Sequence, residues 1–174
     1  KMKKAFTMIE LVFVVVVIGI LAAVIIPSTR TNPVAEASIK LISNIRYAQH
    51  LAMVDDKFDA TNNTWYVNRW KIVFDVTGKK FSIKHNNTEF AKDPQNPAKN
   101  KEDIELKGVT VGLTGTGCNA ATTISFDHLG RPLIGTLTST HGQLLTTDCN
   151  ITVTDGSNPI TLTMRSETGY VSGI

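Results

Sequence analysis

The hydrophobic and polar positions divide the chain into an apolar segment, an amphipathic segment and a long region of alternating residues. Residues 11–26 form a run of 16 positions without a charged or strongly polar side chain. As a helix this run is only about 24 Å long, but extension back to Phe6 gives about 31 Å, enough to cross a bilayer. The extension includes Glu10. A carboxylate inside a membrane helix costs about 2.5–3.5 kcal/mol on insertion scales, so Glu10 needs a partner or a function.

The next segment, residues 28–55, has the period of an amphipathic helix. Pro27 lacks an N–H and would kink or break a continuing helix. Because Pro33 follows it, Asn32 is not expected to adopt helical backbone angles. The helix is expected to end near Asp55. Ile39 is equally compatible with an exposed apolar position and with contact to another chain. Steps of three and four residues then place one apolar stripe on Val34, Ala37, Leu41, Ile45, Ala48 and Ala52, widened by Ile42 and Leu51.

Residues 56–174 are predicted to be rich in β-structure, because apolar residues alternate with polar ones between turn-forming groups. Residues 86–101 are polar, contain Pro94 and Pro97, and are predicted to form an exposed loop. The residues 77–80 predict a turn, with a return strand at 81–83. Alternation marks strands at Tyr66, Trp70, Ile72 and Phe74; at Val109, Val111 and Leu113; at Ile124 and Phe126; at Ile151 and Val153; and at Ile160, Leu162 and Met164.

An amphipathic helix with one apolar stripe needs a partner, and the strands that follow it supply one. The sequence therefore predicts an α+β fold, in which a long N-terminal helix packs on a mostly antiparallel β-sheet or sandwich. The 174 residues suit one domain of ordinary size, and no internal repeat or second independent domain is visible.

The charge balance depends on the first five residues. The chain has 18 Lys and Arg against 15 Asp and Glu, and three of the cations are Lys1, Lys3 and Lys4. Without them the balance is 15 against 15, so broad electrostatic attraction to nucleic acid is not expected.

The apolar N-terminal segment is compatible with three interpretations. A secretory signal peptide has a positive start and an apolar core, but the early acid is unusual and Pro27-Ser28-Thr29 does not provide a small-residue cleavage site. A plain membrane anchor would keep the lysines in the cytoplasm. The third interpretation is a segment that is stored in the membrane and later extracted into a helical filament.

The string Lys3-Lys4-Ala5-Phe6-Thr7-Met8-Ile9-Glu10-Leu11-Val12 closely resembles the start of type IV pilins and type II secretion pseudopilins. This resemblance implies that a prepilin peptidase removes a leader, residues 1–5, by cutting between Ala5 and Phe6, and then methylates the new amino group of Phe6. The family usually has Gly before the cut, so Ala5 is a departure. The resemblance also implies that residues 6–27 form a transmembrane and filament-core helix, with Glu10 and Pro27 at positions typical of the family.

The resemblance to pilins suggests a partner for the Glu10 carboxylate. Cleavage creates an α-amino group on Phe6, and in a helical array Glu10 can pair with the Phe6 amine of an adjacent subunit, which offsets the desolvation of both charges. The alternative is that Glu10 only reaches the lipid headgroups.

The C-terminal region is most similar to H-type minor pseudopilins and FimT-like minor pilins. The similarity rests on short segments: Trp70–Phe74 before a glycine turn, Phe126-Asp127-His128-Leu129-Gly130-Arg131-Pro132, and Thr168-Gly169-Tyr170-Val171. No acidic, glycine-rich segment like the calcium site of major pseudopilins follows Asp155. Tip-initiating pseudopilins typically lack the glutamate found here as Glu10.

Two cysteines, Cys118 and Cys149, enclose 30 residues in a region expected outside the inner membrane. A disulfide between them would stabilise the fold by about 3–4 kcal/mol in the chain-entropy model, and two separate buried thiols are the alternative. No metal site is predicted from the cysteines or from the scattered histidines at positions 50, 85, 128 and 141. His85 continues a strand alternation, and no nucleophile motif predicts catalysis.

Two further patterns have structural and functional interpretations. Trp65, Tyr66, Arg69, Trp70 and Lys71 mix aromatic and positive residues, as single-stranded nucleic-acid sites do. The preferred interpretation is structural, with Tyr66 and Trp70 in the core and Arg69 and Lys71 on the solvated face. Asn150-Ile151-Thr152, with Asp148 upstream, resembles an extended bacterial glycosylation sequon.

The sequence thus predicts a non-enzymatic minor pseudopilin or pilin of a type II secretion system or type IV pilus. Its expected partners are other pilin subunits, the prepilin peptidase and the inner-membrane assembly platform, with no cofactor and no nucleic acid. The expected location is the inner membrane, with the amino terminus in the cytoplasm and the C-terminal region, 56–174, in the periplasm. A DNA-binding minor pilin for natural transformation is the alternative, and a membrane-anchored periplasmic enzyme is a weaker third.

Overall fold

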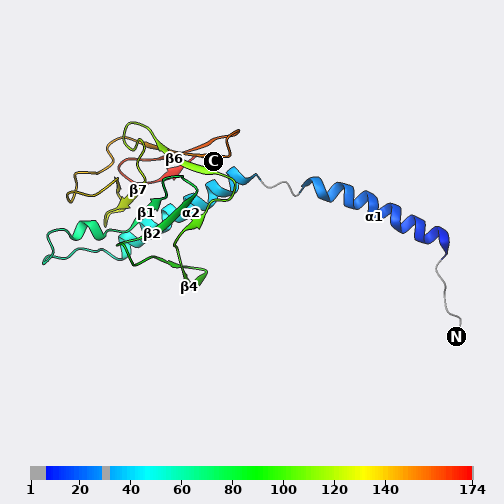
Figure 1. The fold of residues 1–174 in the computed structure, drawn as a ribbon, viewed down its shortest axis with the longest axis horizontal. Helices are drawn as coiled ribbons and strands as arrows, with labels where there is room; N and C mark the ends of the chain where they lie inside the picture. The colour runs from blue at the N-terminus through cyan, green and yellow to red at the C-terminus, as the bar shows by residue number, and fades with distance from the viewer. Residues whose placement is uncertain (1–6, 29–31, 174) are drawn as a thin grey trace. The chain divides into compact units, whose positions relative to one another are not determined.

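A computed structural model describes residues 7–28 and 32–173, except for the side chains of residues 23–28. The chain forms two compact units, residues 1–32 and residues 33–174. The first described unit contains one helix, α1 (Met8–Ser28). The second contains the helix α2 (Pro33–Val54) and the strands (Figure 1).

The predicted N-terminal helix is two helices. α1 continues through Pro27 to Ser28, and α2 starts at Pro33, while Asn32 between them is not helical. Proline suits the first position of a helix because it needs no N–H partner there, and it disfavours helical angles in the residue before it. α2 ends at Val54, next to the predicted end at Asp55.

The strands of the second unit form two larger sheets and a small hairpin, and every described strand pairing is antiparallel. One sheet has the order β5-β2-β1-β7-β8 and the other has the order β11-β10-β9-β6. The bounds are β1 Lys71–Phe74, β2 Lys80–Lys84, β3 Lys92–Asp93, β4 Asn96–Asn100, β5 Ile104–Glu105, β6 Thr110–Thr114, β7 Thr123–Phe126, β8 Pro132–Ile134, β9 Cys149–Thr154, β10 Ile160–Met164 and β11 Val171–Ser172.

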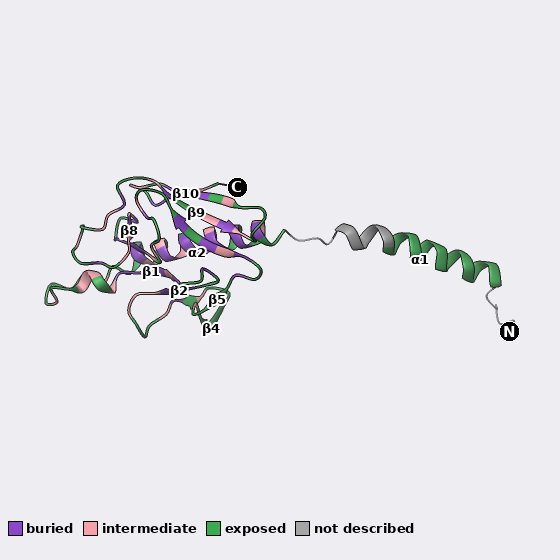
Figure 2. Ribbon diagram, turned by 45° about the horizontal axis from the view of Figure 1, so that its top comes forward, coloured by how far each residue is buried: buried purple, intermediate pink, exposed green. Residues whose placement is uncertain are grey.

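α2 packs against strands of both sheets, namely β1 and β7 of the first and β9, β10 and β11 of the second. The predicted stripe is the buried face of the helix, as the purple segments of α2 in Figure 2 show. Leu41, Ile45 and Ala48 are fully buried. The hydrophobic core described by the structure contains residues of α2 and of both sheets, which confirms the predicted α+β fold of a helix on antiparallel sheets.

Two predicted elements are wrong. The strand expected from Tyr66 starts only at Lys71, because a short 3₁₀-helix, η1 (Trp65–Asn68), precedes it. The side chain of Asn62 accepts hydrogen bonds from the N–H and hydroxyl of Thr64, at 2.9 Å each, and this local pairing favours a turn over an extended chain.

The predicted loop at residues 86–101 contains the hairpin of β3 and β4. Both strands are polar and β4 is exposed throughout, so no apolar alternation marks them in the sequence. Pro94 lies between the two strands, and Pro97 is tolerated because β4 pairs on one side only. The predicted exposure was right, whereas the predicted lack of strands was wrong.

Candidate functional site

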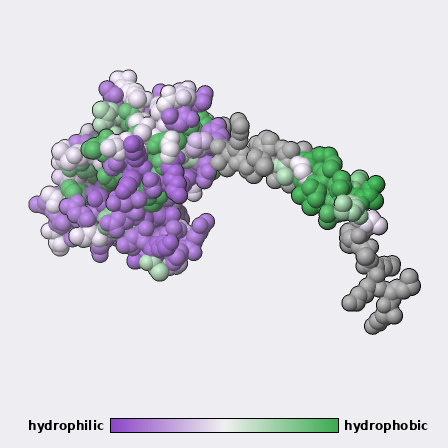
Figure 3. All heavy atoms as spheres, turned by 45° about the vertical axis from the view of Figure 1, so that its right-hand side comes forward, coloured by the Kyte–Doolittle hydropathy of each residue, from purple (hydrophilic) through white to green (hydrophobic). Residues whose placement is uncertain are grey.

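The first candidate site is α1, a helix with apolar side chains on all sides. Its first turn starts at Thr7, whose carbonyl oxygen accepts hydrogen bonds from the N–H groups of Glu10 at 3.1 Å and Leu11 at 3.2 Å. Every described side chain of α1 is exposed within this single chain, and the coloured part of the helix is mostly green, that is hydrophobic, in Figure 3. Phe13, for example, is 69% exposed. A helix that is apolar all round requires a cover of lipid or protein.

Glu10 is the only charged residue of α1, and it lies in the first turn. A carboxylate is favourable there, because the amino end of a helix carries a partial positive charge. Ala5 and Phe6 lie outside the described residues, so the cleavage site, the methylation of Phe6 and the pairing of Glu10 with an amine stay predictions. Within the described part of the chain, no helix is both long enough and apolar enough to cross a membrane.

The second candidate site is a surface groove of about 450 Å³ beside α2. Ile39, which the sequence placed away from the buried stripe, is 59% exposed and lines this groove with Tyr170. Arg46 donates a hydrogen bond to the carbonyl of Val171 at 3.2 Å, and its guanidinium lies 5.5 Å from the centre of the Tyr170 ring. The groove therefore combines apolar side chains with one cation.

Two of the three segments that carry the C-terminal resemblance, those around Gly130 and Gly169, meet at α2. Gln49 donates hydrogen bonds to the carbonyls of Gly130 at 2.8 Å and Thr168 at 2.7 Å. Gly169 has a φ of +64°, and a Cβ there would lie 2.8 Å from the carbonyl oxygen of Gly130. Sequence reasoning did not single out Gln49, because its partners lie 81 and 119 residues away.

The turn at Asp127 is held by a buried carboxylate. Asp127 is 1% exposed and accepts hydrogen bonds from the backbone N–H groups of Leu129 and Arg131. The Arg131 Nε also donates to it, at 2.7 Å. The neighbouring His128 is exposed, so Asp127 orders the turn and does not orient that imidazole.

Arg69 was predicted to lie on the solvated face of the aromatic and basic cluster, and this prediction is wrong. Its side chain is buried, with 3% exposed, and lies 4.8 Å from the centre of the Trp65 ring. Its Nη1 donates to the carbonyl of Thr140 at 2.7 Å, while burial lowers the pKa of Arg69. Trp70 is in the core as predicted, and Tyr66 is half-buried with its hydroxyl donating to Thr138. Arg69 therefore ties η1 to the loop after β8 and is not an exposed contact for nucleic acid.

His85 lies at the end of β2 beside the core. Its Nε2 is 2.9 Å from a carboxylate oxygen of Glu89, and its ring meets Trp70 edge to face at 4.9 Å. Burial lowers the pKa of His85 and outweighs the opposite effect of Glu89. In the described residues, no three His, Cys, Asp or Glu side chains gather as metal ligands.

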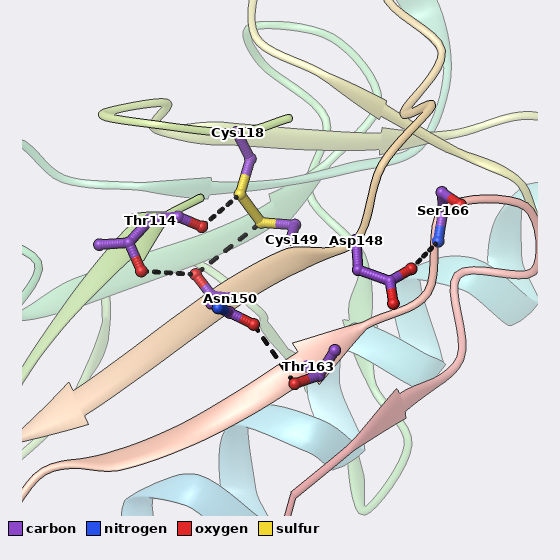
Figure 4. The surroundings of a disulfide bond; sticks show 7 residues. All are labelled: Thr114, Cys118, Asp148, Cys149, Asn150, Thr163 and Ser166. Carbon is purple, nitrogen blue, oxygen red and sulfur yellow. Dashed lines mark hydrogen bonds between the residues drawn. A yellow bond between two sulfur atoms is a disulfide. The ribbon is translucent and has the colours of Figure 1, made fainter. Parts of the chain in front are cut away.

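Cys118 and Cys149 are joined in a disulfide, as the sequence predicted (Figure 4). Their Cα atoms are 5.6 Å apart and both residues are buried. The bond ties the segment after β6 to the first residue of β9. Asn150, the sequon residue, is exposed, but its backbone lies in the middle strand between β6 and β10. Such a paired strand does not present the sequon as an extended loop.

The comparisons with known proteins agree with this architecture. Residues 1–26 match the family described as the prokaryotic N-terminal methylation motif. The fold resembles that of a solved structure, the type IV minor pilin FimU of Pseudomonas aeruginosa, with a TM-score of 0.54 and 15% sequence identity, over 85% of this chain and 92% of that chain. No curated protein matches the chain.

The methylation motif at the amino end and the likeness of the fold to a type IV minor pilin both support the resemblance to type IV pilins. The family resemblance predicted from the first residues is confirmed at this level. The H-type subclass stays a prediction.

Proposed function

We propose that this type IV pilin-like chain is a minor pseudopilin or minor pilin, a non-enzymatic subunit of a type II secretion pseudopilus or a type IV pilus. The observation that carries the proposal is the combination of the methylation motif at residues 1–26 with a pilin fold in the rest of the chain. The motif alone covers a small part of the chain. Because the motif and the pilin fold occur in one chain, we infer that the subunit is processed at its amino end and then assembled.

The apolar helix supplies the mechanism. Before assembly, residues 6–27 hold the chain in the inner membrane, with Lys1, Lys3 and Lys4 in the cytoplasm and the second unit in the periplasm. The prepilin peptidase cuts between Ala5 and Phe6 and methylates Phe6, and the assembly platform then moves the subunit into the filament. Neighbouring helices replace lipid around α1, so its apolar side chains stay covered in both states.

Glu10 favours the move of the subunit from the membrane into the filament. In the membrane, the lipid chains offer its carboxylate no positive or hydrogen-bonding partner that offsets desolvation. In a filament it can pair with the amino group of Phe6 from an adjacent subunit, which is created only by cleavage. The unprocessed subunit lacks that amine at Phe6. Cleavage is therefore a precondition for the paired, assembled state.

Two observations support a structural role over the alternatives. Asp127, the carboxylate next to His128, is used in holding a turn, and His128 itself is exposed. Arg69, one of the cations that would contact DNA in a minor pilin for natural transformation, is buried. The C-terminal resemblance is to H-type pseudopilins of secretion systems and to FimT-like minor pilins alike, so the proposal covers both machines.

The decisive experiment is mass spectrometry of the protein extracted from cells that express a prepilin peptidase. We expect an amino terminus at Phe6 that carries one methyl group. Cells without the peptidase provide the control, and Ala5→Gly, which restores the usual family residue, should give the same terminus. An amino terminus before Phe6, or one after Pro27, contradicts the proposal.

A further inference from the structure

A small pocket with a mixed polar and apolar lining lies on the face of the first sheet opposite the core residues Ile72 and Ile124. It has a volume of about 210 Å³ and is formed by β1, β2 and β7, by Val67 of η1 and by the chain after β8. Its ten lining residues include two lysines and no acid: Val67, Lys71, Val73, Lys84, Asn87, Thr123, Ser125, Gly135, Thr136 and Leu137.

The two lysines lie directly opposite each other in the sheet. Lys71 of β1 pairs in register with Lys84 of β2, and like charges in that position repel. In the described residues neither ammonium forms an ion pair with a carboxylate. Among the described residues, the Lys71 ammonium donates one hydrogen bond, to the carbonyl of Val67 at 2.8 Å, so two of its three N–H donors have no protein acceptor in that part of the chain.

Partial burial increases the free-energy cost of placing the two lysine charges opposite each other. Both lysines are half-buried, and the pKa of Lys71 is lowered, first by burial and then by the Lys84 charge. A positive charge that is partly removed from water is expensive unless an opposite charge accompanies it. The Lys84 ammonium lies 5.9 Å from the centre of the Phe90 ring, which offsets part of this cost. In the described residues, however, no carboxylate neutralises either lysine.

Ser125 adds an independent observation. It pairs in register with Lys71 from the other side, on β7, and lines the same pocket. The residue is 0% exposed, and its Oγ has no hydrogen-bond partner. Buried hydroxyls are normally hydrogen-bonded, so this group provides an unused donor at the floor of a positively charged pocket.

We propose that this pocket binds one oxyanion group, a phosphate or a carboxylate, between Lys71 and Lys84 and above Ser125. The ammonium groups neutralise the anion through charge-assisted hydrogen bonds, and the hydroxyls of Ser125, Thr123 and Thr136 are available for its remaining oxygens. A phosphate fits this donor set better than a carboxylate, because it has more acceptor oxygens and a higher charge. The volume of about 210 Å³ is sufficient for one such group.

The test is isothermal titration calorimetry of the full chain in non-ionic detergent, with sodium phosphate or sodium acetate and with the ionic strength held constant by sodium chloride. We expect saturable binding of phosphate at one site and weaker binding of acetate. Stronger binding of acetate also supports the oxyanion site and identifies the ligand as a carboxylate. Saturable binding of neither anion overturns the proposal.

Variants separate a built site from general attraction. Lys71→Met and Lys84→Met should each weaken binding about tenfold, because each removes a hydrogen bond to a charged group. Ser125→Ala should weaken it by a smaller factor. Lys107→Met is the matched control, since it removes the same charge from an exposed position outside the pocket.

The control also defines the result that contradicts a specific site. If Lys107→Met weakens binding as much as Lys71→Met, the anion responds to net charge alone and the pocket is not its site. Circular dichroism of each variant confirms the fold. Should Lys71→Met fail to fold, Lys84→Met at the end of β2 carries the same test.

Discussion

The positively charged side chain of Arg69 is buried in the second unit, where it joins η1, the loop after β8 and the start of β1. Its guanidinium lies against the Trp65 ring of η1 and donates to Thr140 of the loop after β8, while its own backbone immediately precedes the buried Trp70. A buried cation is retained only when such partners offset its desolvation. The residue is thus a structural connection between loops that strand pairing does not join.

Replacing Arg69 by Met should lower the free energy of unfolding by about 2–3 kcal/mol. The change removes a hydrogen bond from a charged donor and the stacking on Trp65, and it leaves the Thr140 carbonyl without its partner. Urea unfolding of the full chain in detergent, followed by circular dichroism, measures the loss. Arg165→Met is the control, because its ion pair with Asp148 is at the surface and should matter little. Equal losses for the two variants would refute the structural role.

Glu10→Ala should leave membrane insertion and cleavage intact and reduce entry into filaments. The reason is that removal of the carboxylate makes the helix more apolar but leaves the Phe6 amine of a neighbour without its partner. Quantification of the variant in sheared filaments, beside wild-type partner subunits, measures the effect. Glu10→Asp retains the charge and should restore part of the incorporation. Normal incorporation of the alanine variant would show that Glu10 is dispensable.

At the scale of elements, the turn between β1 and β2 connects the two sheets. Asp75 orders this turn by accepting hydrogen bonds from the N–H groups of Lys79 and Lys80. Gly78 then accepts a hydrogen bond from the N–H of Val111 in β6 at 2.8 Å. Because Gly78 has a φ of +67° and a Cβ would lie in contact with the Val111 backbone, the close approach depends on the missing side chain.

Gly78→Ala should therefore lower the free energy of unfolding by about 3 kcal/mol or more, through backbone strain together with loss of the contact to β6. Gly108→Ala is a matched control, since Gly108 has a φ of +72° but no atom near the position of the added Cβ. The control should lose only about 1–2 kcal/mol. Thermal unfolding of both variants gives the comparison, and a similar loss in each would contradict the role of close packing.

The disulfide acts at the same scale, because it ties the segment after β6 to β9 across a sequence separation of 31. The double variant Cys118→Ser and Cys149→Ser should lose about 3–4 kcal/mol of unfolding free energy in the chain-entropy model. Non-reducing peptide mapping of protein from an oxidising compartment should recover the linked pair. Two free thiols that react with an alkylating reagent would show that the bond does not form there.

For the whole molecule, the periodic elements could be predicted from the sequence and the long-range polar contacts could not. The stripe around Leu41 and the alternation at Ile151 reflect burial on one face, so periodicity identifies them. The β3–β4 hairpin has no buried face to mark it. Arg69 and Gln49 are polar residues whose partners are loop carbonyls far along the chain, and no local pattern encodes such a contact.

The charge distribution of the whole molecule bears on DNA binding. Without Lys1, Lys3 and Lys4 the formal charges balance, so attraction to DNA must come from specific cations. The predicted resemblance to FimT-like minor pilins implies that a DNA-binding member would have an arginine after the corresponding glycine, whereas Tyr170 follows Gly169 here. Arg46 is near Tyr170, but its guanidinium is engaged with the Val171 carbonyl, and Arg165 is paired with Asp148.

We therefore expect the mature chain to bind DNA weakly or not at all, with at most stacking of single-stranded bases on Tyr170, which is 55% exposed. Labelled single- and double-stranded DNA should be titrated at about 50 and 200 mM salt, because binding through many phosphate contacts collapses over that range. Arg46→Ala tests the cation that lies at the Tyr170 ring, Arg165→Ala tests the cation whose backbone pairs with Tyr170, and Lys107→Ala is an exposed control. Submicromolar binding with a steep salt dependence, lost in either arginine variant and kept in the control, would overturn this expectation and favour a role in DNA uptake.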